Sequence, residues 1–349
     1  MELDIVSYGR RGPGGSLRLN PEQVEQVKRT TSRVPEVMVK VSGGARDIGG
    51  AKAHLKYIGR HGKLEVETDE GLSLQGRDIA DHLVADWQLD LCRSQYKPKP
   101  AEGQKDTRAK LVHNIVLSMP AGTPSDKVLN AARVFARENF ALQYRYAMVL
   151  HTDQAHPHVH LVVKCEHETE PGHRLYIRKD TLRQWREQFA ALMREEGVPA
   201  NATPRQIRGQ VKSAWKDPIH HRLRAQRAFE DLPATQRASR RPPPGSTFMR
   251  RKVEGVGKEL QMGSLSPEPG RGALTATRGQ VEADWVATAE ALRRQGQEQL
   301  ASQVERFTRA LPSVRTDRER IAAGLLGALR ARGAARHTDA HDRSQDRSR

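Results

Sequence analysis

Histidines are concentrated in one short stretch of the sequence. Four of the fourteen lie within residues 151–160: His151, His156, His158 and His160. Side chains of a β-strand point alternately to its two faces, so a strand over 158–164 places His158 and His160 on one face. The intervening valine and leucine then point to the core. Two imidazoles on one face can chelate one cation, so the pattern predicts a metal site rather than an unrelated surface cluster.

His151 is the third candidate ligand. It ends a strand predicted over 146–150, and an antiparallel hairpin brings that end beside the start of the strand that carries His158. Three neutral imidazoles leave positions on an ion open for substrate oxygens. Asp153 is close enough in the sequence to hold one of these rings in a single tautomer.

Tyr57 is the candidate nucleophile among six tyrosines. On a helix predicted over 47–60 it falls off the apolar stripe, on the side that carries His54 and His61. Three cationic side chains surround it: Lys56, Arg60 and Lys63. A phenol beside cations and a divalent ion has a better-populated phenolate, as attack on phosphate requires. A half-buried aromatic at a helix edge explains Tyr57 equally well on these grounds.

The elements that must position these residues follow from hydrophobic periodicity and turn residues. Strands are predicted over 37–41 (ended by Gly43-Gly44), 111–119, 146–150 and 158–164. Helices are predicted over 47–60, 78–91, 125–139 and 180–195. This order favours an α+β fold: a central antiparallel sheet with helices packed on its faces.

The charge distribution suggests three segments. The chain has 349 residues and a net charge of +17, of which residues 201–349 carry +13 (29 Lys and Arg against 16 Asp and Glu). We expect a flexible arm over 1–34, a folded domain over 35–210, and a basic tail over 211–349. The tail is expected to be partly disordered, with a linker at 237–246, a long exposed helix over 281–311 and a shorter one over 321–329. Its charge indicates nucleic acid as partner, although a solubilising tail is the alternative.

Composition excludes several classes of protein. No stretch approaches the roughly 18 apolar residues of a membrane span, so no membrane insertion is expected. Two cysteines, Cys92 and Cys165, cannot build a disulfide scaffold, and the N-terminus has no apolar signal region. A reducing cytoplasm is the expected setting.

Three motifs together resemble the MobP/VirD2-type conjugative relaxases of the His–hydrophobic–His endonuclease superfamily. Residues 43–63, with Tyr57, resemble their nucleophile motif. Residues 112–120 resemble the second motif, which ends in a DNA-contacting serine, here Ser118. Residues 151–160 resemble the third, histidine motif. Their order and spacing match across roughly 37–210.

The resemblance implies a strand-specific DNA endonuclease acting at the transfer origin of a mobile element. Tyr57 would be the nucleophile and would end as a 5′-phosphotyrosine, leaving a free 3′-OH, in a step that can be reversed to rejoin the strand. His151, His158 and His160 would bind Mg²⁺ or Mn²⁺, and Asp153 would support a ligand or take a proton. The expected DNA contacts are Ser118, Lys56, Arg60 and Lys63.

The resemblance also implies partners and a location. These are single-stranded and nicked DNA at the transfer origin, accessory relaxosome proteins, and a type IV coupling protein that reads the Arg-rich end, Arg330 to Arg349, for which simple disorder is the alternative. A bacterial cytoplasmic location is implied, with export of the protein covalently attached to DNA. The tail has no Walker A sequence, so no fused helicase is implied.

Three alternatives stay open. A rolling-circle replication initiator of the same superfamily would use identical chemistry at another origin. Alternating His156, His158 and His160 also resemble the histidine-triad nucleotide hydrolases, which need no metal, although the chain length, the net charge, His151 and Asp153 argue against them. A non-catalytic DNA-binding accessory would leave the histidine cluster unexplained. Sensitivity to a chelator separates a relaxase from a triad hydrolase.

Overall fold

The chain divides into two compact units, Pro21–Thr203 and Met1–Asn20 with Pro204–Arg349. The computed structural model describes residues 18–330 except 93–97, 99, 102, 105, 171, 211–224, 226–227, 231 and 243–246. All candidate site residues belong to the unit Pro21–Thr203. Within the described ranges, no helix is both long and apolar enough to cross a bilayer.

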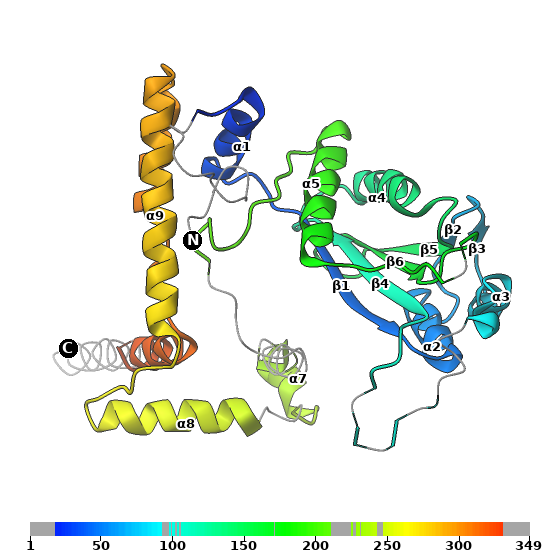
Figure 1. Ribbon diagram of the computed structural model, residues 1–349. Helices are drawn as coiled ribbons and strands as arrows, with labels where there is room; N and C mark the ends of the chain where they lie inside the picture. The colour runs from blue at the N-terminus through cyan, green and yellow to red at the C-terminus, as the bar shows by residue number, and fades with distance from the viewer. Residues whose placement is uncertain are drawn as a thin grey trace, which may run out of the picture. The chain divides into compact units, whose positions relative to one another are not determined.

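A six-stranded sheet forms the centre of the unit Pro21–Thr203, with strand order β1-β4-β6-β5-β2-β3 (Figure 1). Every neighbouring pair is antiparallel, which confirms the α+β prediction. The strands are β1 (Met38–Ala45), β2 (Val66–Thr68), β3 (Ser73–Leu74), β4 (Val112–Ser118), β5 (Tyr146–His151) and β6 (His158–Lys164). β2 and β3 escaped prediction because two or three residues are too few to reveal an alternating pattern.

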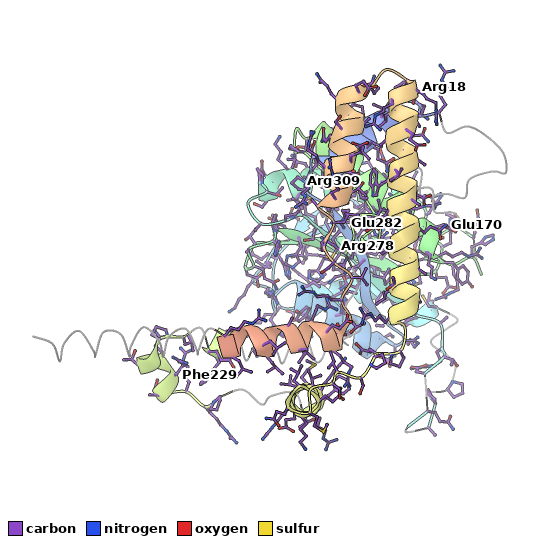
Figure 2. The ribbon with its side chains drawn as sticks, turned by 90° about the vertical axis from the view of Figure 1, so that its left-hand side faces the viewer. Arg18, Glu170, Phe229, Arg278, Glu282 and Arg309 are labelled. Atoms are coloured by element: carbon purple, nitrogen blue, oxygen red, sulfur yellow. The ribbon has the colours of Figure 1, made fainter. Side chains whose placement is uncertain are left out.

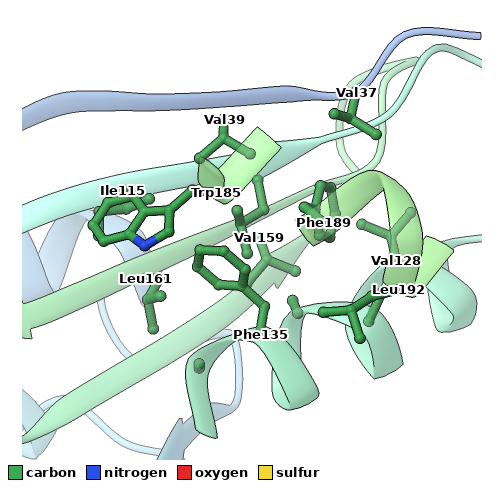
Figure 3. Close-up of a cluster of buried hydrophobic side chains, with 14 of the residues drawn as sticks. Val37, Val39, Ile115, Val128, Phe135, Val159, Leu161, Trp185, Phe189 and Leu192 are labelled. Carbon is green, nitrogen blue, oxygen red and sulfur yellow. The ribbon is translucent and has the colours of Figure 1, made fainter. Parts of the chain in front are cut away.

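The larger core lies between one face of the sheet and two helices, α4 (Ser125–Phe140) and α5 (Lys179–Glu195). Phe135 of α4 and Trp185 and Phe189 of α5 meet Val159 and Leu161 of β6 there (Figure 3). The apolar residues that alternate with the histidines of β6 therefore point into this core, as the two-residue period predicts. Truncating Phe135, which is fully buried, would cost about 3–5 kcal/mol.

The opposite face of the sheet carries α2 (Ile48–Ile58), α3 (Ile79–Asp86) and a 3₁₀ turn at Leu89–Leu91. Leu55 and Ile58 of α2 pack in a second core with Val149 of β5 and Val162 of β6. Asp47 begins α2 by accepting a hydrogen bond from the backbone N–H of Gly50 at 2.8 Å. α2 therefore presents its polar side next to the sheet face that carries the histidines.

Strand β1 continues through the glycines that were expected to end it. It runs to Ala45, with a shift in its register against β4 between Val41 and Gly43. Gly44 has φ +144°, and a Cβ there would lie 2.3 Å from the carbonyl oxygen of Val112. The expected strand end was wrong because Gly44 permits close approach of two backbones rather than a turn.

Part of the predicted flexible arm is ordered. Residues Pro21–Thr31 form α1, with Val27, Thr30 and Thr31 buried. The Thr30 hydroxyl lies 2.9 Å from that of Thr203 and accepts a hydrogen bond from Asn201 at 3.1 Å. α1 escaped prediction because few apolar residues reveal its period, and polar contacts hold it. Residues 1–17 of the arm lie outside the described residues.

The second unit contains a helical hairpin where one long exposed helix was expected. α9 (Arg271–Arg294) and α10 (Glu298–Arg309) lie side by side (Figure 2), with Gly296 at φ +76° between them. Trp285 is buried against Phe307, with ring centroids 5.2 Å apart, and its indole N–H donates to the Ile207 carbonyl at 3.0 Å. The apolar rhythm is thus an internal core rather than an exposed stripe. The described residues of this unit also include helices α7 (Ala234–Ala238), α8 (Thr247–Gln261) and 317–330, whereas residues 331–349 lie outside the described ranges.

Candidate metal centre and nucleophile

Three imidazoles converge on the sheet face that carries α2. His151 of β5 stands directly opposite His158 of β6, and His160 lies two residues further along β6. One ligand atom from each residue lies within 4.8 Å of the others. The ring centroids are 4.6 Å apart for His151 and His160, 5.1 Å for His151 and His158, and 5.2 Å for His158 and His160. The antiparallel register thus assembles the cluster that the sequence predicts.

Backbone carbonyls fix the tautomers of two of these rings. His151 Nε2 lies 2.6 Å from the carbonyl oxygen of Ile58, at the end of α2. His158 Nδ1 lies 3.0 Å from the carbonyl oxygen of His156. A carbonyl oxygen only accepts, so both nitrogens carry protons, and His151 Nδ1 and His158 Nε2 keep their lone pairs. The group that orients His151 is therefore the Ile58 carbonyl.

A side-chain amide borders the third ring. His160 Nδ1 lies 3.5 Å from Oδ1 and 3.4 Å from Nδ2 of Asn114, a residue of β4 that is only 2% exposed. The amide Nδ2 also donates to the Ser42 hydroxyl at 2.6 Å. Sequence reasoning did not assign Asn114. The available signal was a polar residue at an inward position of a predicted buried strand, on the same face as Ser118.

Burial keeps two of the rings neutral. It lowers the pKa of His160 to about 3, helped by the charges of His151 and His158, and it also lowers the pKa of His151. Neutral imidazole is the form that binds metals, so these rings are ready to coordinate at pH 7. Nitrogen lone pairs, fixed tautomers and low proton affinity together fit a divalent transition-metal ion.

Tyr57 lies beside the three histidines. It belongs to the last turn of α2, and its ring centroid is 6.4 Å from that of His160, with the two rings perpendicular. Its side chain is 54% exposed, so a substrate can reach the phenol. The guanidinium carbon of Arg60 lies 5.3 Å from the ring centroid, where a positive charge interacts favourably with the aromatic face.

Arg60 also connects Tyr57 to the turn between β5 and β6. Its Nη2 lies 2.5 Å from Asp153 Oδ2 and 3.3 Å from His151 Nδ1. Partial burial raises the pKa of Asp153, but the charge and hydrogen bond of Arg60 outweigh this and leave that pKa lowered. Arg60 and His61 both have left-handed backbone conformations, φ +50° and +57°. Each costs roughly 1–2 kcal/mol for a residue with a Cβ, and together they reverse the chain directly after the Tyr57 turn.

The remaining candidates occupy different positions around this cluster. Ser118 stands opposite His158 across β4 and β6, but it is buried and its hydroxyl donates to the Met119 carbonyl at 3.4 Å. Lys56 Nζ lies 3.1 Å from Asp81 of α3, so part of its charge is compensated. Lys63 follows α2, and its backbone carbonyl accepts a hydrogen bond from Gln75 at 3.0 Å.

The segment that holds this cluster is similar to known proteins. Residues 57–198 match the family model described as the nuclease domain of MobA/VirD2-like relaxases. The T-DNA border endonuclease VirD2 of Rhizobium radiobacter is 25% identical over 214 residues, covering 56% of this chain and 49% of that protein. VirD2 of Agrobacterium fabrum is 24% identical over 219 residues, covering 58% and 48%. The chain thus spans about half the length of the curated relatives it matches.

Solved structures give weaker similarities. A chain from "Molecular Basis of Vancomycin Resistance Transfer in Staphylococcus aureus" has a TM-score of 0.30 and 11% identity, covering 48% of this chain and 99% of that one. The MobM relaxase domain, in a Mn-bound crystal structure with plasmid pMV158 oriT DNA, has a TM-score of 0.35 and 11% identity, covering 54% and 98%.

Proposed function

We propose that the chain, whose residues 57–198 match the model for the nuclease domain of MobA/VirD2-like relaxases, is a DNA relaxase that nicks one strand at the transfer origin of a mobile element. The observation that carries the proposal is an exposed phenol, Tyr57, held beside three clustered imidazoles. A nucleophile and a cation site within one substrate's reach are what a metal-assisted transesterification by tyrosine needs.

The proposed step is a transesterification. The Tyr57 oxygen attacks the phosphorus of one phosphodiester, the bond from phosphorus to the 3′ oxygen breaks, and the phenolic proton is balanced by the proton that the 3′-OH gains. The product is a 5′-phosphotyrosine and a free 3′-OH. One phosphodiester replaces another, so the step is nearly thermoneutral and runs in reverse to rejoin the strand.

His151, His158 and His160 would hold the metal ion. When bound, Mg²⁺ or Mn²⁺ would polarise the scissile phosphate and neutralise charge on its oxygens. Nitrogen ligands favour Mn²⁺ over Mg²⁺, because Mg²⁺ prefers oxygen. The hydrogen bonds to the Ile58 and His156 carbonyls support this proposal. Each one takes up the protonated nitrogen of its ring, so that His151 Nδ1 and His158 Nε2 keep the lone pairs that an ion needs.

The charged residues beside Tyr57 have proposed roles of their own. Arg60 would stabilise the phenolate and contact a phosphate, and Asp153 would hold Arg60 in place rather than act as a base, because its pKa is lowered. Ser118, Lys56 and Lys63 remain proposed DNA contacts. By pairing with Arg60, the carboxylate of Asp153 would also hold the Arg60 guanidinium to one side of the position that the ion would take.

The proposed substrate is DNA that is single-stranded around the nick. The +13 charge of residues 201–349 would add sequence-independent, salt-dependent affinity for the neighbouring duplex. A cytoplasmic location, accessory relaxosome proteins, recognition by a type IV coupling protein, and export with the attached DNA are further parts of this proposal.

The decisive experiment is detection of a covalent adduct. The full chain is incubated with labelled single-stranded oligonucleotides that tile the DNA around its own gene, with Mn²⁺ or with a chelator. We expect an adduct in Mn²⁺ that is absent in Tyr57→Phe and retained in Tyr176→Phe, a control at a tyrosine that is 72% exposed. An adduct that persists in Tyr57→Phe would assign the nucleophile elsewhere, and nucleotide hydrolysis that survives chelation would favour a histidine-triad hydrolase.

A further inference from the structure

Asn114 is an uncharged polar residue buried in the middle of the sheet. It stands between Gly43 of β1 and Val162 of β6 in register, on the face that carries the three histidines. It is 2% exposed. Burying an amide without hydrogen bonds costs several kcal/mol. A buried asparagine at this position therefore needs hydrogen-bond partners that offset the loss of its contacts with water.

Its partners come from three elements. The amide Nδ2 donates to Ser42 Oγ of β1 at 2.6 Å, and the amide plane borders His160 Nδ1 of β6. The third partner is His54 of α2, whose pKa is lowered by burial while a hydrogen-bonding contact with Asn114 opposes that shift. Asn114 therefore interacts with side chains from β1, β6 and α2.

An amide can face the His160 ring in two ways with opposite consequences. If Nδ2 donates to Nδ1, the ring proton must sit on Nε2, which then cannot bind an ion. If Oδ1 accepts from Nδ1–H, Nε2 keeps its lone pair and can coordinate. Both amide atoms are near Nδ1, so the ring does not decide between these orientations. The orientation with Nδ2 on Ser42 Oγ at 2.6 Å leaves Oδ1 for the Nδ1 proton, and the tautomer measurement below tests it, because a hydroxyl can either accept or donate.

We propose that Asn114 is a positioning residue for the cation site: its carbonyl oxygen accepts the His160 Nδ1 proton while Ser42 holds its amide nitrogen. This inference rests on the proposed function of the three histidines as metal ligands. It completes their support, because the Ile58 and His156 carbonyls perform the same task for His151 and His158. Each ring then has one protonated nitrogen that donates to a protein oxygen and one nitrogen that keeps its lone pair.

His54 encloses the amide from the helix side. Its Nε2 is buried and has no hydrogen-bond partner among the described residues. Because burial lowers its pKa, the ring is uncharged and adds no repulsion toward an ion beside His160. The uncharged ring of His54 thus lies beside Asn114, on the same helix that carries Tyr57.

The test measures Mn²⁺ binding to the full chain by titration calorimetry, without DNA. Asn114→Leu removes the acceptor at nearly constant volume, and we expect its affinity for Mn²⁺ to fall about 10- to 100-fold, as for other residues that support metal ligands. Asn114→Asp keeps the acceptor and should bind within a few-fold of the native protein or more tightly. Asn139→Leu removes a half-buried amide of α4, which bonds to Phe135 and Gln188, and should leave Mn²⁺ affinity unchanged.

A second measurement reports the tautomer itself. Nitrogen NMR of ¹⁵N-histidine-labelled protein, with His160 assigned by His160→Gln, should show Nδ1 protonated in the native chain and a mixed or reversed tautomer in Asn114→Leu. Equal Mn²⁺ affinity and an unchanged tautomer in a folded Asn114→Leu chain would overturn the inference alone. A native chain that binds no Mn²⁺ would overturn the proposed metal site with it.

Discussion

Arg60 Nη2 lies 2.5 Å from Asp153 Oδ2, an ion pair that ties the turn after α2 to the turn between β5 and β6. The same nitrogen is 3.3 Å from His151 Nδ1, the lone pair that an ion would use. A positive charge therefore stands both over the candidate nucleophile and at the edge of the candidate cation site. Its effects on these two groups should have opposite signs.

Replacing Arg60 should separate the two effects. Arg60→Gln removes a unit charge a few ångströms from the ion, a repulsion of about 1 kcal/mol or more at surface dielectric values. We expect Mn²⁺ affinity to rise at least about fivefold in calorimetry, while the rate of adduct formation falls because the Tyr57 phenolate loses its cation. Arg183→Gln on α5 is the control. Weaker Mn²⁺ binding in Arg60→Gln would mean that Arg60 supports the site instead of competing with the ion.

Metal addition should stabilise the protein through the three histidines. At a Mn²⁺ concentration about 100 times the dissociation constant, the stabilisation is about 2.7 kcal/mol, or roughly 5–10 °C in melting temperature. His158→Ala should abolish the shift, and a chelator should reverse it. His156→Ala provides a close control, because its ring is exposed and only its carbonyl oxygen contacts His158. A full shift in His158→Ala would place the ion elsewhere.

Stability should depend on pH through His113 of β4. Burial, and then the charge of Lys110, lowers the pKa of His113 to about 4, and its Nδ1 has no hydrogen-bond partner among the described residues. The unfolded ring has a pKa near 6.5, so the stabilisation is complete above about pH 6.5 and is lost as the pH falls toward 4. Between these values His113 contributes about 1.4 kcal/mol per pH unit.

Urea unfolding at several pH values between 7 and 4.5, in a chelator, measures this contribution. His113→Gln should flatten the pH dependence of the unfolding free energy by about the slope of one proton, whereas His82→Gln, at an exposed position of α3, should not. A His113→Gln protein with the native slope would show that the ring is already protonated in the folded state.

Removing the second unit should affect DNA affinity more than chemistry. A chain ending at Thr203 loses the +13 charge, so its affinity for duplex DNA should fall and the dependence of that affinity on salt should flatten. We place the cut before Ile207 and Gly209 because both contact α9. A chain ending at Arg330 loses only five arginines and three aspartates and serves as control. Loss of the Tyr57 adduct in the shorter chain would mean that residues 204–349 contribute to catalysis.

The sequence is sufficient to predict the features of the site that depend on side-chain alternation along one strand and on the pairing of two strands in a hairpin. His158 and His160 share a face because strand side chains alternate, and His151 joins them because adjacent antiparallel strands bring their ends together. The contact of Arg60 with Asp153 was beyond prediction, since it depends on how α2 docks on the sheet. The place of Asn114 beside His160 was missed because it depends on which strands pair, here β4 with β6. The α9–α10 hairpin was missed because its apolar rhythm continues across Gly296.

The segment His158–Lys164 performs two tasks with alternate residues: imidazoles on one side, and Val159, Leu161 and Val163 in the core under α4 and α5 on the other. Sliding this strand by a single residue against its neighbours would exchange the sides and bury the imidazoles among Phe135 and Trp185. The aliphatic packing therefore disfavours any shift of this strand by an odd number of residues, which would remove the imidazoles from their common site. A change such as Leu161→Ala, on the face opposite the imidazoles, would remove part of the packing that favours this register.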